Sequence, residues 1–138
     1  MKTIKQLSVF LENQKGRLGD ILSVLSEEKI QIQAASVADT SDYGILRLIT
    51  SDQYKAMELL KSKGILANMN EVLAIKISAI TSDFADAVKI LTEGQVGINY
   101  LYTFYQQDKL VLIVRPDDLN LAIKVVESHG LELIQGWE

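Results

Sequence analysis

The sequence contains no cysteine, so disulfide bonds, thiolate nucleophiles and cysteine-ligated metal sites are excluded. It has one histidine and therefore no histidine cluster, and we expect neither a metal nor a cofactor. No hydrophobic run approaches the roughly 18–20 residues that span a bilayer, and the N-terminal segment lacks the apolar core of a signal peptide. We therefore expect a soluble, cytoplasmic protein with no membrane partner.

Positive charge is also scarce, because 14 Lys and Arg stand against 18 Asp and Glu and give a formal net charge of −4. An acidic average argues against binding of the phosphate backbone irrespective of sequence, so we expect no nucleic acid partner. By contrast, 48% of the 138 residues are hydrophobic, enough to build the core of one domain or of two small ones.

Groups suited to catalysis are missing as well. The only histidine, His129, precedes Gly130 at the end of a predicted helix, where a partial positive charge is favourable. Acidic pairs such as Asp117 and Asp118 lie at predicted helix ends and indicate caps or solvated faces rather than an acid–base dyad. We expect no catalytic residue, and the protein is not predicted to be an enzyme.

The sequence repeats itself when it is shifted by 66 residues without a gap. Leu7 then falls on Leu73, and strand-like positions fall on strand-like positions. Asp52 falls on Asp118 and Gly64 on Gly130, so residues typical of helix starts and helix ends also coincide. We interpret this as two copies of one unit, a first domain of residues 1–70 and a second of residues 71–138.

Each copy shows the element order β-α-β-β-α-β. Period-two and helical patterns predict, in the first copy, strands at 6–12, 30–38, 45–50 and 65–68 and helices at 18–28 and 53–63. In the second copy they predict strands at 72–78, 96–105, 110–115 and 131–136 and helices at 83–92 and 118–128. Asp52 is placed to cap a helix start and Gly64 to end that helix. The predicted fold class is α+β, two tandem ferredoxin-like units with antiparallel sheets and helices on one face.

Two features concern the packing of the copies. Residues 68–71, NMNE, predict a tight turn, because no Pro-, Gly- or Ser-rich linker separates the copies. Residues 110–114 are apolar on both strand faces, whereas a sheet with one face in water alternates with polar residues. We expect the second face to be covered by the other copy or by another chain, and the latter would make the protein a homodimer.

The stretch ENQKGRLGDIL, residues 12–22, joins the first strand to the first helix. Backbone N–H groups at the start of a helix attract an anionic group. Gly16 and Gly19 have no side chain that would keep a ligand away from the backbone. The side-chain amide of Asn13 can both donate and accept hydrogen bonds. This chemistry suits a small amino acid, and no phosphate-binding glycine motif is present. The alternative is a simple turn, with Asn13 in an Asx turn and Lys15 and Arg17 in solvent.

The aromatic stretch NYLYTFY, residues 99–105, places Tyr100, Tyr102 and Phe104 on one strand face. RNA-recognition modules share the predicted topology and stack bases on strand aromatics, so an RNA-binding module is one alternative. Their aromatics lie on two central strands, whereas here they gather on one second strand without a basic rim. We favour a role in packing, in the core or between the units, with Tyr100 or Tyr102 lining the ligand site.

Two local motifs in the tandem pattern resemble those of ACT domains, the amino-acid-sensing modules of metabolic regulation. NQKGRL, residues 13–18, is similar to the family's first loop, and GIN, residues 97–99, is similar to its second-strand motif. Each copy departs from the pattern in one place. The second copy has SAITSDF at 78–84 without a glycine, and the first has KIQIQ at 29–33 in place of GIN.

The resemblance implies that a ligand lies at an interface between two ACT-like units, against the first loop of one of them. The residues expected to bind it are Asn13, Lys15, Gly16, Arg17, Leu18, Gly19, Asn99 and Tyr100. The implied function is non-catalytic allosteric regulation through binding of a free amino acid, and the strand that is apolar on both faces adds the expectation of a homodimer. The alternative is a small regulatory subunit that docks on a separate metabolic enzyme.

Overall fold

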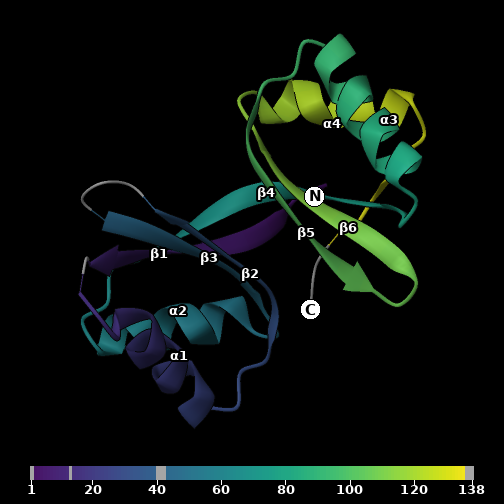
Figure 1. Ribbon diagram of the computed structural model, residues 1–138. Helices are drawn as coiled ribbons and strands as arrows, with labels where there is room; N and C mark the ends of the chain where they lie inside the picture. The colour runs from purple at the N-terminus through teal and green to yellow at the C-terminus, as the bar shows by residue number, and fades with distance from the viewer. Residues whose placement is uncertain (1, 13, 40–42, 136–138) are drawn as a thin grey trace. The chain divides into compact units, whose positions relative to one another are not determined.

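The computed structural model describes residues 2–12, 14–39 and 43–135. It divides into two compact units: a first unit of Lys5–Asn70, and a second unit of Glu71–Trp137 together with Met1–Ile4. The elements follow the order expected from the sequence, β-α-β-β-α-β in each unit (Figure 1).

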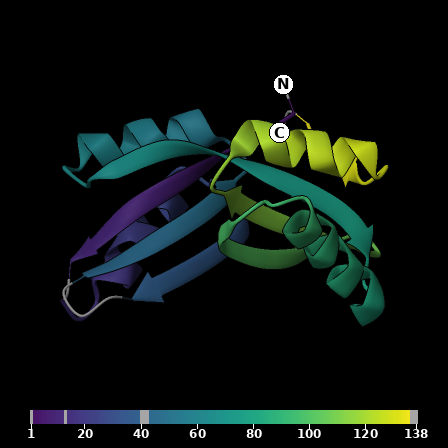
Figure 2. The ribbon, with the colours of Figure 1, turned by 90° about the horizontal axis from the view of Figure 1, so that it is seen from above.

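The first unit has an antiparallel sheet in the order β2-β3-β1-β4. Leu7 in β1 pairs with Leu48 in β3, which in turn pairs with Ala35 in β2. Helices α1 and α2 lie on one face of the sheet (Figures 1 and 2), where Ile21 and Leu60 join the buried strand residues. The elements are β1 (Ile4–Glu12), α1 (Arg17–Glu27), β2 (Ile32–Asp39), β3 (Tyr43–Thr50), α2 (Gln53–Ser62) and the first residues of β4 (Ala67–Ser78).

The second unit repeats this arrangement with the sheet order β5-β6-β4-β7. Leu73 of β4 pairs with Val114 of β6, and Leu101 of β5 pairs with the same residue from the other side. The further elements are α3 (Thr81–Glu93), β5 (Ile98–Gln106), β6 (Lys109–Pro116), α4 (Leu119–Ser128) and β7 (Glu132–Leu133). The predicted ferredoxin-like α+β fold is confirmed in both units.

The predicted caps are also confirmed. The side chain of Asp52 accepts a hydrogen bond from the Lys55 N–H at 3.0 Å, and Asp118 accepts one from the Leu121 N–H at 3.0 Å. Helix α2 is followed by Gly64 with φ of +73°, a conformation that favours glycine. The two units therefore begin and end their second helices by the same local chemistry.

The tight turn expected at residues 68–71 is wrong. These residues continue the extended backbone of β4, which supplies its first residues to the sheet of the first unit and its later ones to the sheet of the second. The segment has no glycine to take a positive φ, and the Ser8 hydroxyl on β1 donates a hydrogen bond to the Asn70 side chain. Pairing with β1 therefore keeps the segment extended.

The core of β6 is apolar on both faces, as its sequence indicated. Leu110, Leu112 and Val114 belong to the cluster under the helices, and Val111 and Ile113 on the opposite face are fully buried as well. In the part of the chain that the structure describes, no helix combines the length and apolar character needed to cross a membrane.

Candidate functional site

The first loop turns the end of β1 into the start of α1 through Gly16. This residue is the N-cap of α1 and has φ of +83°, in the left-handed region that L side chains rarely adopt. Its carbonyl accepts a hydrogen bond from the Asp20 N–H at 3.0 Å, and the Arg17 N–H donates to the Gln14 carbonyl at 3.3 Å. The glycine is therefore required by the backbone path itself. Asn13 lies outside the described residues.

The start of α1 is open to solvent. Lys15, Gly16, Leu18 and Gly19 are exposed, and an ideal Cβ on Gly19 would meet no atom within 4 Å. Among the residues that the structure describes, the N–H groups of Leu18 and Gly19 have no hydrogen-bond acceptor. Free N–H groups at a helix start attract an anionic group such as a carboxylate.

Arg17 is held against the end of β1 rather than extended into solvent. Its Nη2 lies 3.5 Å from Glu12 Oε1, and the side chain is 26% exposed. Its Nε is buried and has no hydrogen-bond partner in the described part of the chain. The partly exposed Arg17 guanidinium therefore places a positive charge in the first turn of α1, where it would attract a carboxylate.

Asn99 and Tyr100 lie on β5, in the second unit. Asn99 is exposed and sits at a register shift, since Ile98 pairs with Pro116 and Tyr100 pairs with Arg115. The ring of Tyr100 stacks on that of Tyr102 with centroids 6.5 Å apart. These residues and the first loop belong to different units, so their convergence on one ligand stays a prediction.

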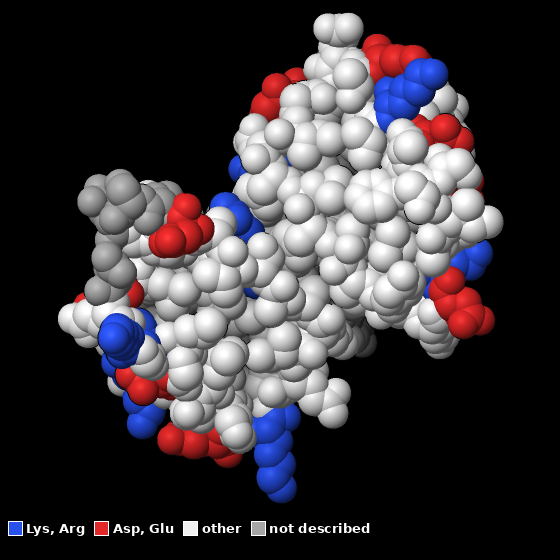
Figure 3. Space-filling view, viewed as in Figure 1, with Lys and Arg blue, Asp and Glu red and all other residues white. Residues whose placement is uncertain are grey.

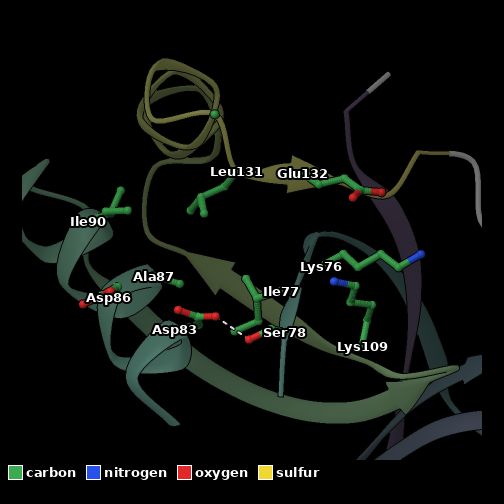
Figure 4. Close-up of a pocket in the computed structure, with 11 residues that line it drawn as sticks. Lys76, Ile77, Ser78, Asp83, Asp86, Ala87, Ile90, Lys109, Leu131 and Glu132 are labelled. Atoms are coloured by element: carbon green, nitrogen blue, oxygen red, sulfur yellow. Dashed lines mark hydrogen bonds between the residues drawn. The ribbon is translucent and has the colours of Figure 1, made fainter. Parts of the chain in front are cut away.

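The second unit contains a pocket that the sequence reasoning missed. It has a volume of about 500 Å³ and lies at the N-terminal part of α3, near the end of β4 and the turn after α4 (Figure 4). The loop at residues 78–84, which corresponds to the first loop of the first unit, has no glycine and therefore does not show the first-loop motif. A signal was available in the repeat, because Ala87 stands where the first copy has the larger Ile21.

The aromatic residues of β5 do not form the platform of an RNA-recognition module. β5 lies at the edge of the sheet order rather than at its centre, and Tyr102 and Phe104 pair with the buried Ile113 and Val111. On the described part of the face in Figure 3, blue and red side chains are interspersed and none of it is a continuous basic surface. The alternative of RNA binding therefore gains no support.

The fold and the open helix start define a tandem pair of ferredoxin-like units with a candidate anion-binding loop. The chain belongs to the ACT domain pair family, whose model matches residues 2–137. ACT domain pairs are regulatory domains. Among curated protein sequences, none matches this chain.

Solved structures show the same architecture. The crystal structure of protein BT0572 from Bacteroides thetaiotaomicron is similar with a TM-score of 0.90 and 33% sequence identity, over 96% of this chain and 92% of that one. The ligand-free regulatory subunit of aspartate kinase from Thermus thermophilus has a TM-score of 0.63 at 12% identity, over 91% and 92% of the two chains. The aspartate kinase regulatory subunit from Thermus flavus has a TM-score of 0.61 at 14% identity, over 90% of each chain. The Thermus proteins share the fold.

Proposed function

We propose that this protein is a non-catalytic regulator that binds a free amino acid at the loop before α1, at an interface between ACT-like units. The observation that carries the proposal is the open start of α1, where the Leu18 and Gly19 N–H groups lack acceptors among the described residues. The carboxylate of an amino acid would accept from these N–H groups and from Arg17. Lys15 and Leu18, on either side of Gly16 and Arg17, are exposed as well.

The regulatory step is a shift between arrangements of the units. A ligand that contacts two units favours the arrangement in which both contacts exist, in proportion to its difference in affinity between the arrangements. Asn99 and Tyr100 are the proposed contacts from a second unit, in the same chain or in the partner of a homodimer. The protein would act in the cytoplasm, either as a sensor by itself or through a separate metabolic enzyme.

The test is calorimetric titration of the full chain with each common amino acid, using a pair of matched variants. Gly19→Val places a branched side chain into the open space at the helix start, at a residue whose φ is not positive. Ser23→Val places the same side chain one turn further along the exposed face of α1. We expect saturable binding to the wild type and to Ser23→Val, and binding weakened at least about tenfold in Gly19→Val.

Two results would contradict the proposal. Equal affinity of the Gly19→Val and Ser23→Val variants for the amino acid would show that the loop before α1 does not contact the ligand. Absence of binding by every amino acid would reject the sensor function, and stable association with a larger enzyme on purification would then favour the docking subunit. Circular dichroism of each variant establishes that the fold is retained.

A further inference from the structure

The sheet of the first unit has an exposed apolar patch on the face opposite α1 and α2. Val9 and Leu11 of β1 are buried in the core under the helices, so Phe10 between them points to the opposite face. Phe10 is 38% exposed, Tyr43 of β3 is 37% exposed, and Leu66 just before β4 is 65% exposed. These three residues are called the outer patch below.

The three residues of the outer patch are neighbours. The rings of Phe10 and Tyr43 stack with their centroids 5.0 Å apart and an interplanar angle of 27°. The Phe10 N–H donates a hydrogen bond to the Leu66 carbonyl at 3.0 Å, which joins β1 to the segment that leads into β4. All three line one pocket of about 140 Å³, together with Ser8, Val9, Ile45 and Asn68. None of the described residues that line it is charged.

The second unit shows that the fold does not require apolar side chains at these positions. With the shift of 66 residues, the outer patch corresponds to three charged residues: Lys76, Lys109 and Glu132. They lie on three neighbouring strands of the second sheet (Figure 4). Charged side chains suit a sheet face in water, whereas large apolar side chains are stabilised when a partner covers them. The outer patch is therefore suited to association.

Charged residues border the outer patch at its two ends along the strands. Glu12 pairs with Tyr43 at one end, and Arg47 pairs with Ser8 at the other. Four residues of strand separate the two ends, or about 13 Å. The side chain of Glu12 is more exposed than that of Arg17, which contacts it at 3.5 Å. The Glu12 carboxylate is therefore open to a further cation.

A patch with opposite charges at its two ends is complementary to a second copy of itself. Consider two such sheets face to face, related by a two-fold axis that lies between them and runs perpendicular to their strands. This symmetry places the Glu12 end of one copy over the Arg47 end of the other, and the uncharged middle of one patch over that of its partner.

We propose that the outer patch is the contact surface of a homodimer, in which the first-unit sheets of two copies face each other. Phe10, Tyr43 and Leu66 of each copy are covered by those of the other, and Glu12 of each copy pairs with Arg47 of the other. This dimer is the homodimer of the proposed function, but its contact requires no bound ligand.

Sedimentation velocity of the full-length protein, without any amino acid present, measures the dimer. Leu66→Glu places a charge in the outer patch, at an exposed side chain where the fold should tolerate it. Tyr54→Glu makes a similar change at a 67% exposed residue of α2, outside the patch. We expect the wild type and Tyr54→Glu to form dimers, and the dissociation constant of the dimer to rise at least about tenfold in Leu66→Glu.

A charge swap tests the two-fold arrangement. Glu12→Arg puts arginine opposite arginine in the dimer, and Arg47→Glu puts glutamate opposite glutamate. Each variant alone should therefore dimerise at least about tenfold more weakly than the wild type. An equimolar mixture of the two variants restores opposite charges at both contacts and should form a heterodimer, which native mass spectrometry distinguishes by its mass. Circular dichroism establishes that both variants are folded.

The results that would overturn the proposal are distinct from a failure of amino acid binding. A wild type that stays monomeric at millimolar concentration rejects the contact, and so does a dimer that is as stable in Leu66→Glu as in Tyr54→Glu. Absence of the heterodimer from the mixture rejects the two-fold arrangement. Amino acid binding by a monomeric wild type would keep the sensor function and reject this contact, whereas a dimer lost in Leu66→Glu that binds no amino acid would do the reverse.

Discussion

Gly97 and Asp117 are joined by two hydrogen bonds. The Gly97 N–H donates to Asp117 Oδ1 at 2.9 Å, and the Asp117 N–H donates to the Gly97 carbonyl at 2.9 Å. An ideal Cβ on Gly97 would lie 2.5 Å from Asp117 Oδ2, so the close approach requires glycine. The contact fixes the chain just before β5 against the residue that follows β6. The contact with Asp117 within the second unit thus explains the glycine of the GIN motif.

Gly97→Ala should therefore destabilise the protein. The new methyl group forces the Asp117 carboxylate to rotate away, and the Gly97 N–H loses a charged acceptor, which costs about 1–3 kcal/mol. Denaturant unfolding measures the change. In an Asp117→Ala background the same substitution should cost clearly less, because the clash and the hydrogen bond are both absent. Equal costs in the two backgrounds would show that the contact does not couple the residues.

The two glycines of the first loop should respond in opposite directions. Gly16→Ala forces a Cβ into a backbone with φ of +83° and should destabilise the protein by about 1–2 kcal/mol. Gly19→Ala replaces glycine in the first turn of α1, with no atom near the new Cβ, and should stabilise it by about 0.5–1 kcal/mol. Thermal unfolding of both variants provides the comparison. A similar change in both would mean that Gly16 is not held in the left-handed conformation.

The paired caps give a test of the repeat. Asp52 and Asp118 each accept a hydrogen bond from the backbone N–H three residues later, at 3.0 Å. Asp52→Ala and Asp118→Ala should each cost about 1 kcal/mol of the free energy of unfolding. Glu58→Ala on the exposed face of α2 serves as a control and should change stability little. Loss at only one of the two caps would contradict their equivalence.

The elements and their caps could be predicted because they depend on local signals. Period-two runs, helical spacing, Asp52 and Gly64 lie within single segments, and the repeat supported each assignment with a second copy. Helix α3 begins at Thr81, two residues before its predicted start, since Ile80 precedes it without a side-chain cap. Boundaries without a capping side chain leave no clear mark in the sequence.

Local patterns in the sequence did not predict the pocket of the second unit or the continuous strand β4. Ile77, Ala87, Lys109 and Leu131 come together only through the pairing of β4 with β6 and the packing of α3. Three of residues 68–71 are polar and the segment resembles a turn, yet pairing with β1 keeps it extended. In both cases the deciding interactions are between segments distant in the sequence.

Gln53 has a structural role that the helical pattern of the sequence did not indicate. Its Nε2 donates to the carbonyls of Lys5 and Leu48 at 2.8 and 3.0 Å, and its Oε1 accepts from the backbone N–H and the hydroxyl of Thr50. The side chain therefore ties the start of α2 to β1 and β3. The equivalent residue of the second unit is Leu119, which packs against the core instead.

Replacing Gln53 by the residue of the other unit, Gln53→Leu, should cost about 2–3 kcal/mol. The substitution fits a helix and adds apolar surface, but it leaves the buried Thr50 and two carbonyls without their partner. Gln31→Leu, at an exposed residue before β2, is the matched control and should change the free energy of unfolding by less than about 0.5 kcal/mol. Hydrogen exchange should accelerate at the Thr50 amide in Gln53→Leu and not in the control. If Gln53→Leu were as stable as the wild type, the apolar contact would outweigh the hydrogen bonds, and the two units would tolerate the same residue at this position.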